Sequence, residues 1–87
     1  MPETYTAFVI DDDSEMRNSL GVLLERSGWH VTRFSGAQAA LERLEVAAPD
    51  VVLSDVRMPG MTGLDLLEHM QDARTPPLVL ISAHGDI

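Results

Sequence analysis

Residues 51–63, VVLSDVRMPGMTG, join an unbroken apolar run to a single acid and then to a turn. The first three residues show no alternation of apolar and polar side chains, which indicates a strand buried on both faces. Asp55 closes the run, and Pro59-Gly60 predicts a turn shortly after it. A carboxylate is therefore expected at the carboxyl end of a central strand.

Three further segments are expected to form strands beside this one. Residues 7–10 and 78–81 are uniformly apolar, which is typical of buried strands. Residues 29–34 are aromatic and β-branched, but polar side chains interrupt them, which favours a position at the edge of the sheet. The two apolar runs end in polar residues, as the strand before Asp55 does.

The segments between the strands carry apolar residues three and four positions apart, the spacing of one helix face. The predicted stripes are Met16, Leu20, Leu23 and Leu24, then Ala37, Ala40, Leu41 and Leu44, then Leu64, Leu67 and Met70. Asp13 or Ser14 is expected to cap the first helix, Gly28 to end it, and Ser35 to cap the second. Strands alternating with helices imply parallel pairing through right-handed crossovers. The sequence therefore predicts a doubly wound α/β fold in the order β-α-β-α-β-α-β.

Oxygen-bearing side chains follow three of the predicted strands: Asp11 with Asp12, then Asp55, then Ser82. The carboxyl ends of parallel strands meet at one edge of a sheet, where ligands bind. Carboxylates about 4 Å apart repel by about 4 kcal/mol at an effective dielectric constant of about 20, so a cluster needs a cation, a raised pKa or good solvation. Oxygen ligands favour Mg²⁺, with Mn²⁺ as its closest substitute. The competing interpretation is that these acids only cap helices.

Asp55 is the best candidate for a nucleophile because it stands alone on the central strand. Aspartate carboxylates form aspartyl-phosphates, and phosphoryl transfer requires mainly positioning and charge neutralisation. The Ser82 hydroxyl, at the end of the next strand along the chain, could hydrogen-bond a phosphate oxygen. Together these residues predict a Mg²⁺-dependent phosphoryl site.

The 87 residues carry 14 acidic and 6 basic side chains, for a net charge of −8, and all the basic residues are arginine. This balance argues against direct nucleic-acid contact, which needs a basic face. The sequence has no cysteine, no apolar run of membrane-spanning length and no visible secretory signal. One small cytoplasmic domain is expected.

The chain resembles the receiver domain of bacterial two-component response regulators over essentially all of its 87 residues. The resemblance rests on three segments in family order and spacing: FVIDDD at 8–13, SDVRMPGMTG at 54–63 and LISA at 80–83. The second segment, with AHGD at 83–86, is similar to the FixJ and NtrC-like subgroups. The resemblance implies a flavodoxin/CheY-like fold with strand order 2-1-3-4.

The resemblance also implies residue roles. Asp55 would accept a phosphoryl group from a sensor histidine kinase. Asp12, Asp55 and the backbone carbonyl of Arg57 would bind Mg²⁺ directly, and Asp11 through a water molecule. Ser82 would be the switch hydroxyl that turns toward the phosphate. Such a domain is not a classical enzyme; it catalyses its own phosphorylation and normally controls an attached output domain, in this subgroup a transcriptional one.

The sequence departs from the family after the fourth strand. Residues 1–87 are expected to hold the first two-thirds of a receiver, without the last strand, the last two helices or an output domain. The family's lysine is also missing, because the chain contains no lysine. Residues 78–81 would then be an exposed apolar edge, and such edges pair with other chains. Dimerisation or segment swapping through this edge is expected.

Two alternatives to the phosphoacceptor remain. A phosphatase of the haloacid-dehalogenase type also uses a strand-end aspartate and Mg²⁺, but it wants a second acid two residues later, where this chain has Arg57. The other alternative is a phospho-inert receiver-like module for protein contact. The intact set of Asp11, Asp12, Asp55 and Ser82 argues against that alternative.

Overall fold

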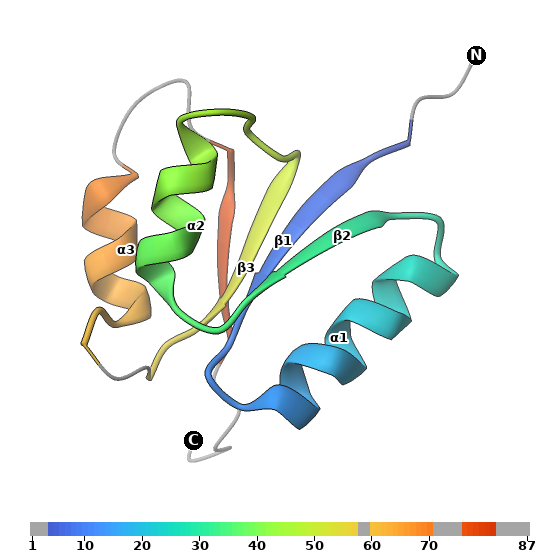
Figure 1. Cartoon of the computed structure of the whole chain (residues 1–87), viewed down its shortest axis with the longest axis horizontal. Helices are drawn as coiled ribbons and strands as arrows, with labels where there is room; N and C mark the ends of the chain where they lie inside the picture. Colours follow the sequence, from blue (N-terminus) through green and yellow to red (C-terminus); the bar gives the residue numbers. More distant parts are fainter. Residues whose placement is uncertain (1–3, 58–59, 71–75, 82–87) are drawn as a thin grey trace.

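The computed structural model describes residues 4–57, 60–70 and 76–81 of the chain. Within this part, strands and helices alternate in the predicted order (Figure 1). The elements are β1 (Thr6–Ile10), α1 (Ser14–Arg26), β2 (His30–Phe34), α2 (Ala37–Leu44), β3 (Val51–Asp55), α3 (Gly63–His69) and β4 (Leu78–Ile81).

All strand pairs in the sheet are parallel, and the strand order is β2-β1-β3-β4. The predicted doubly wound fold and its strand order are therefore confirmed. β2 lies at one edge, as its polar side chains predicted, and within the described residues β4 lies at the other. The chain passes from β1 to β2 on one side and then crosses back to β3 on the other, so the winding reverses between β1 and β3. This reversal places the carboxyl ends of the two central strands side by side.

The two faces of the sheet are covered by different helices. α1 packs over β1 and β2 on one face, whereas α2 and α3 lie together over the other (Figure 1). Phe8 and Phe34 meet edge to face beneath α2 and α3, with ring centroids 4.8 Å apart. The buried core cluster on this face consists of Phe8, Ile10, Ala37, Ala40, Val52, Leu66 and Met70. Removal of this apolar surface from water holds the strands and the two helices together.

The helix ends follow local sequence rules, with one correction. Asp13 is the N-cap of α1, and its Oδ1 accepts hydrogen bonds from the backbone N–H groups of the next turn. Gly28 follows the helix with a φ of 97°, a left-handed conformation that glycine adopts without strain. Ser35 was expected to cap α2, which is wrong: Gly36 is the N-cap, and it makes no side-chain cap hydrogen bond.

Two of the predicted apolar stripes are only partly buried. Leu23 is 62% exposed because α1 turns Gly21 toward the sheet, and two residues correspond to about 200° around a helix. In α3 the buried side chain is Leu66, so Leu64 points away and is 57% exposed, and Leu67 is 39% exposed. The apolar stripe predicted for α3 is therefore wrong at the start of the helix, where Leu66 and not Leu64 faces the core.

An ion pair fastens α1 to the edge strand β2. The guanidinium of Arg33 donates two hydrogen bonds to the Glu25 carboxylate, at 3.1 and 3.2 Å. The hydrogen bond from Arg33 lowers the pKa of Glu25 and raises the pKa of Arg33 itself. The same guanidinium lies against Gly21, where an added Cβ would collide with it. Glycine at this position therefore leaves room for the Arg33 guanidinium.

An aromatic pair covers the amino ends of β1 and β2, at the opposite end of the sheet from Asp55. The rings of Tyr5 and Trp29 lie 5.6 Å apart between centroids, and the N–H of His30 donates to the Tyr5 carbonyl at 2.8 Å.

Among the described residues, no helix is both long and apolar enough to cross a membrane.

Thr62 and Asp65 form a capping box at the start of α3. The Thr62 hydroxyl accepts from the Asp65 N–H at 3.1 Å, and the Asp65 carboxylate accepts from the Thr62 N–H at 3.0 Å. We expect Thr62→Ala to lower the free energy of unfolding by about 1 kcal/mol, because one N–H of the first turn loses its partner. Urea unfolding followed by circular dichroism measures this loss. Ser19→Ala removes an exposed hydroxyl from α1 and is the control; equal loss in both variants would contradict the expectation.

Candidate functional site

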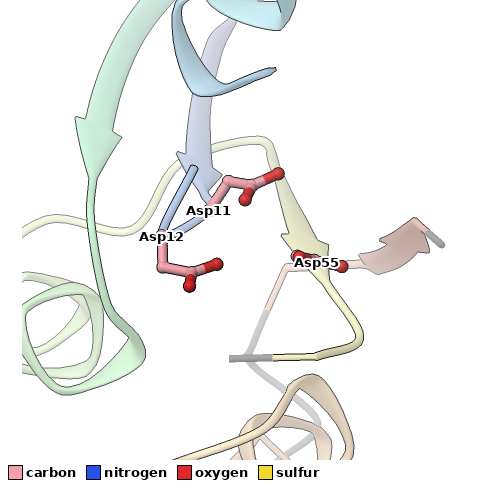
Figure 2. Close-up of side chains that lie close together, drawn as sticks. All are labelled: Asp11, Asp12 and Asp55. Carbon is pink, nitrogen blue, oxygen red and sulfur yellow. The ribbon is translucent and has the colours of Figure 1, made fainter. Parts of the chain in front are cut away.

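Three carboxylates meet at the carboxyl edge of the sheet. Asp11 and Asp12 follow β1 directly, and Asp55 is the last residue of β3 (Figure 2). One carboxylate oxygen from each residue lies within 4.8 Å of the others. Asp11 and Asp55 are buried, with 2% and 3% exposure, whereas Asp12 is open to solvent. The predicted convergence of these three acids is therefore found in the structure.

The loop after β1 is fixed by hydrogen bonds on both sides of Asp12. The backbone N–H of Asp11 donates to the Phe34 carbonyl of β2 at 3.1 Å, which extends the sheet by one residue. The Asp11 carbonyl accepts from the Arg17 guanidinium at 2.7 Å, and the Asp11 carboxylate accepts from the Asp13 N–H at 2.9 Å. Asp11 is thus held through its N–H, its carbonyl and its carboxylate.

Asp55 is positioned by its own strand and by the loop that follows. Its Oδ1 accepts from the backbone N–H of Arg57 at 3.3 Å, which orients the carboxylate at the mouth of the site. The N–H of Gly63 donates to the Val56 carbonyl at 3.0 Å and brings the start of α3 against this turn. A Cβ on Gly63 would lie only 2.6 Å from the Asp55 carbonyl oxygen, so the close approach requires glycine.

The acids influence one another electrostatically. Burial raises the pKa of Asp11 above its ordinary value, and the negative charges of Asp55, Asp12 and Asp13 raise it further. The hydrogen bond from the Asp13 N–H acts in the opposite direction without reversing the shift. The net rise means that the fold disfavours the charged form of the Asp11 carboxyl.

The donor set fits a hard divalent cation. All three side-chain ligands are carboxylates, and their oxygens are close enough together to share one ion. Mg²⁺ uses one or two carboxylates with carbonyl, water and phosphate oxygens, a combination that an edge with one solvent-exposed acid can accommodate. Asp11, Asp12 and Asp55 would hold such an ion, and its positive charge would offset both the burial of the Asp11 charge and the repulsion between the acids, which raise the pKa of Asp11.

Three parts of the predicted site remain predictions. Ser82, the expected switch hydroxyl, lies outside the described residues. Arg57 is described and its N–H contacts Asp55, but its carbonyl as a metal ligand stays a prediction. The carboxylate geometry also does not test whether Asp12 and Asp55 bind the ion directly while Asp11 binds it through a water molecule.

Sequence reasoning missed Arg17. Its side chain reaches the Asp11 carbonyl from the first turns of α1, six residues along the chain. No motif signals this contact, because an arginine on an amphipathic helix most often faces solvent. A helix starting at Asp13 does place residue 17 one turn above the cap, but only the structure shows that the side chain bends back toward the strand end.

The raised pKa of Asp11 has a consequence for stability. At pH values between the pKa of Asp11 in the unfolded chain and its higher pKa in the fold, the folded state binds more protons than the unfolded state. The contribution of Asp11 to the free energy of unfolding therefore falls as the pH rises through this range. We therefore expect Asp11→Asn to be more stable than the wild type in metal-free buffer at neutral pH and to lose this part of the pH dependence. Urea unfolding across the acidic to neutral range measures both effects. A variant less stable than the wild type at neutral pH would contradict the expectation.

Comparison with known proteins identifies the family of this chain. Residues 7–87 match the response regulator receiver domain. The chain is 46% identical over 81 residues to the transcriptional regulatory protein FixJ of Bradyrhizobium diazoefficiens, covering 92% of this chain and 40% of FixJ. It is 41% identical over 83 residues to the DNA-binding transcriptional regulator NtrC of Klebsiella pneumoniae, covering 93% of this chain and 18% of NtrC.

A solved structure agrees with these relatives. The structure of a putative response regulator from Chloroflexus aurantiacus matches with a TM-score of 0.90 at 30% identity, covering 98% of this chain and 72% of that one. The chain spans less than half the length of FixJ and of NtrC, and the family match contains every described helix and strand except the first residue of β1. The chain therefore belongs to the response regulator receiver domain family.

Proposed function

We propose that this chain is a cytoplasmic signalling domain that accepts a phosphoryl group on Asp55 from a sensor histidine kinase, with Mg²⁺ as cofactor. The observation that carries the proposal is the geometry of the three acids. Asp55 ends a buried central strand, and the carboxylates of Asp11 and Asp12 lie within 4.8 Å of its own. Membership of the receiver family supports the same role.

The transfer is a displacement at phosphorus. A carboxylate oxygen of Asp55 forms the new O–P bond, the P–N bond of the kinase phosphohistidine breaks, and the leaving imidazole nitrogen keeps the electron pair and takes up a proton. The Arg57 N–H holds one Asp55 oxygen, which fixes the direction of the other. Bound Mg²⁺ would neutralise the charge shared by the carboxylates and the incoming phosphoryl oxygens.

The remaining roles follow the family pattern. Asp12, Asp55 and the Arg57 carbonyl would bind the ion directly, and Asp11 through water. The exposure of Asp12 and the burial of Asp11 are compatible with that division. Ser82 would donate its hydroxyl to a phosphoryl oxygen and so report phosphorylation to the rest of the receiver.

Incubation with acetyl phosphate tests the proposal directly. We expect intact mass spectrometry to show one added phosphoryl group when Mg²⁺ is present and none when EDTA replaces it. Hydroxylamine should remove the group, because an aspartyl-phosphate is an acyl phosphate. A chain that binds Mg²⁺ but never carries the adduct would instead be the phospho-inert interaction module. Turnover of a phosphoester without any adduct would favour the phosphatase, against which Arg57 already argues.

The proposed partner is a protein rather than DNA. A net charge of −8 opposes contact with phosphate backbones, and the kinase supplies the phosphoryl group. FixJ and NtrC are named as transcriptional regulators, so we further propose that a receiver of this kind controls a transcriptional output in its parent protein.

Self-association through β4 is a further expected property of the 87-residue chain. Within the described residues β4 pairs only with β3, its sequence LVLI carries no charge, and Val79 is 45% exposed. The other edge strand, β2, carries Arg33, which discourages pairing there. We expect sedimentation velocity to show a concentration-dependent dimer that Val79→Lys weakens. Val31→Lys on β2 is the matched control; a monomer at all concentrations would contradict the expectation.

A further inference from the structure

We propose that Arg17 is a positioning residue for the acid-bearing loop between β1 and α1. This inference rests on the proposed function in taking Mg²⁺ as the ion that the loop binds. The Arg17 guanidinium belongs to α1 and forms no hydrogen bond or ion pair with the carboxylates of Asp11, Asp12 and Asp55; it acts on the backbone that carries them.

Arg17 contacts both ends of the segment 11–13. Its Nη1 donates to the Asp11 carbonyl at 2.7 Å, and its backbone N–H donates to the Asp13 carbonyl at 2.9 Å. Asp12 lies between these two anchors and makes no hydrogen bond to any other described residue. The direction of the Asp12 carboxylate therefore depends on the backbone that Arg17 and the helix cap hold in place.

The burial of Asp11 makes the contact important. Its residue exposure is 2%, and a backbone carbonyl in such a place needs a hydrogen-bond partner. Arg17 supplies a charged donor at a short distance, the stronger kind of hydrogen bond. Without it, we expect the loop to rotate the carbonyl toward water, and that rotation moves the neighbouring carboxylates.

Position and charge make opposite predictions for Arg17. As a nearby positive charge alone, the guanidinium would repel Mg²⁺, so its removal would tighten binding. As a positioning group it keeps the ligands together, so its removal weakens binding. Loss of a group that orients metal ligands typically costs 10- to 100-fold in affinity. We expect the positional effect to exceed the charge effect, with Arg17→Ala binding Mg²⁺ about tenfold more weakly.

The experiment compares Arg17→Ala, Arg17→Lys and Arg26→Ala in the full 87-residue chain. Arg26→Ala removes the same charge from the last turn of α1, about 13 Å along the helix, and is the matched control. Mg²⁺ affinity is measured by NMR titration, and exchange of the Asp13 amide is measured without metal. We expect Arg17→Ala to lose affinity and amide protection, Arg17→Lys to recover most of both, and Arg26→Ala to change neither substantially.

The outcomes separate this inference from the proposed function. Equal or tighter Mg²⁺ binding in Arg17→Ala, with unchanged protection of the Asp13 amide, would overturn the positioning role. Should the wild type bind no Mg²⁺, the proposed function fails, while the metal-free amide protection still decides whether Arg17 holds the loop. Should Arg17→Ala fail to fold, Arg17→Lys is compared instead with Asp13→Ala, which removes the helix cap. Mg²⁺ affinity and amide protection closer to the wild type in Arg17→Lys than in Asp13→Ala support the role. Values in Arg17→Lys at or below those of Asp13→Ala overturn it.

Discussion

Replacement of Asp55 with asparagine is expected to abolish the phosphoryl adduct completely while leaving the fold intact. The amide has nearly the same shape as the carboxylate, and its oxygen can still accept the hydrogen bond from the Arg57 N–H. It cannot supply the anionic oxygen that attacks phosphorus. Removal of one negative charge beside Asp11 also relieves part of the repulsion at the site, so the metal-free variant should be no less stable than the wild type.

The matched control for Asp55→Asn is Glu68→Gln. Glu68 is an exposed acid on α3, so the control removes one carboxylate from the surface without touching the three acids of the site. Intact mass spectrometry after incubation with Mg²⁺ and acetyl phosphate should show the adduct in the control and in the wild type only. An adduct that persists in Asp55→Asn would mean that another residue accepts the phosphoryl group.

Gly63→Ala is expected to be strongly destabilising. An added Cβ would lie 2.6 Å from the Asp55 carbonyl oxygen and 2.8 Å from the Leu80 Cδ2. The first neighbour is backbone of the central strand β3 and the second is a side chain of β4, so the backbone of α3 has to move. Overpacking of this kind costs about 3 kcal/mol. For a small domain that loss is a large fraction of the total stability.

Gly36→Ala provides the comparison for Gly63→Ala. Gly36 has an extended backbone with φ of −157°, and nothing lies within 4 Å of the place where its Cβ would stand. Urea unfolding followed by circular dichroism should therefore show a small change for Gly36→Ala and a large one for Gly63→Ala. Similar midpoints for the two variants would contradict the steric argument. In a folded Gly63→Ala chain, slower formation of the phosphoryl adduct is expected, because the shift also displaces Asp55.

The fold could be predicted from the sequence because several independent signals agree. Apolar runs without alternation identified the buried strands, and the polar side chains of residues 29–34 identified the edge. The convergence of Asp11, Asp12 and Asp55 followed from topology alone, since parallel strands bring their carboxyl ends to one edge of the sheet.

The phase of the helices could not be predicted in the same way. In α3, Leu64 and Leu67 form one possible apolar stripe, and Gly63, Leu66 and Met70 form another. The choice between them is tertiary: the close approach of Gly63 to the Asp55 backbone turns the second stripe inward. A search for apolar side chains alone gives no weight to a glycine, although here the glycine sets the orientation.

The Arg17 contact lies beyond sequence reasoning for a related reason. Its acceptor is a backbone carbonyl, and every residue has one, so no side-chain pattern marks the partner. Such a contact depends on how the β1–α1 loop leaves the sheet. The loop geometry in turn depends on the Asp13 cap and on the bond from the Asp11 N–H to Phe34.

The position of Trp29 has a practical consequence for optical spectroscopy. It is the single tryptophan of the chain, and it packs on Tyr5 at the amino ends of β1 and β2. Tyr5 and Asp11 are six positions apart along an extended chain, which is about 20 Å. We therefore expect the indole emission to report unfolding and to change little when a ligand binds at the acids. Fluorescence can follow denaturation with Mg²⁺ present or absent without a correction for binding.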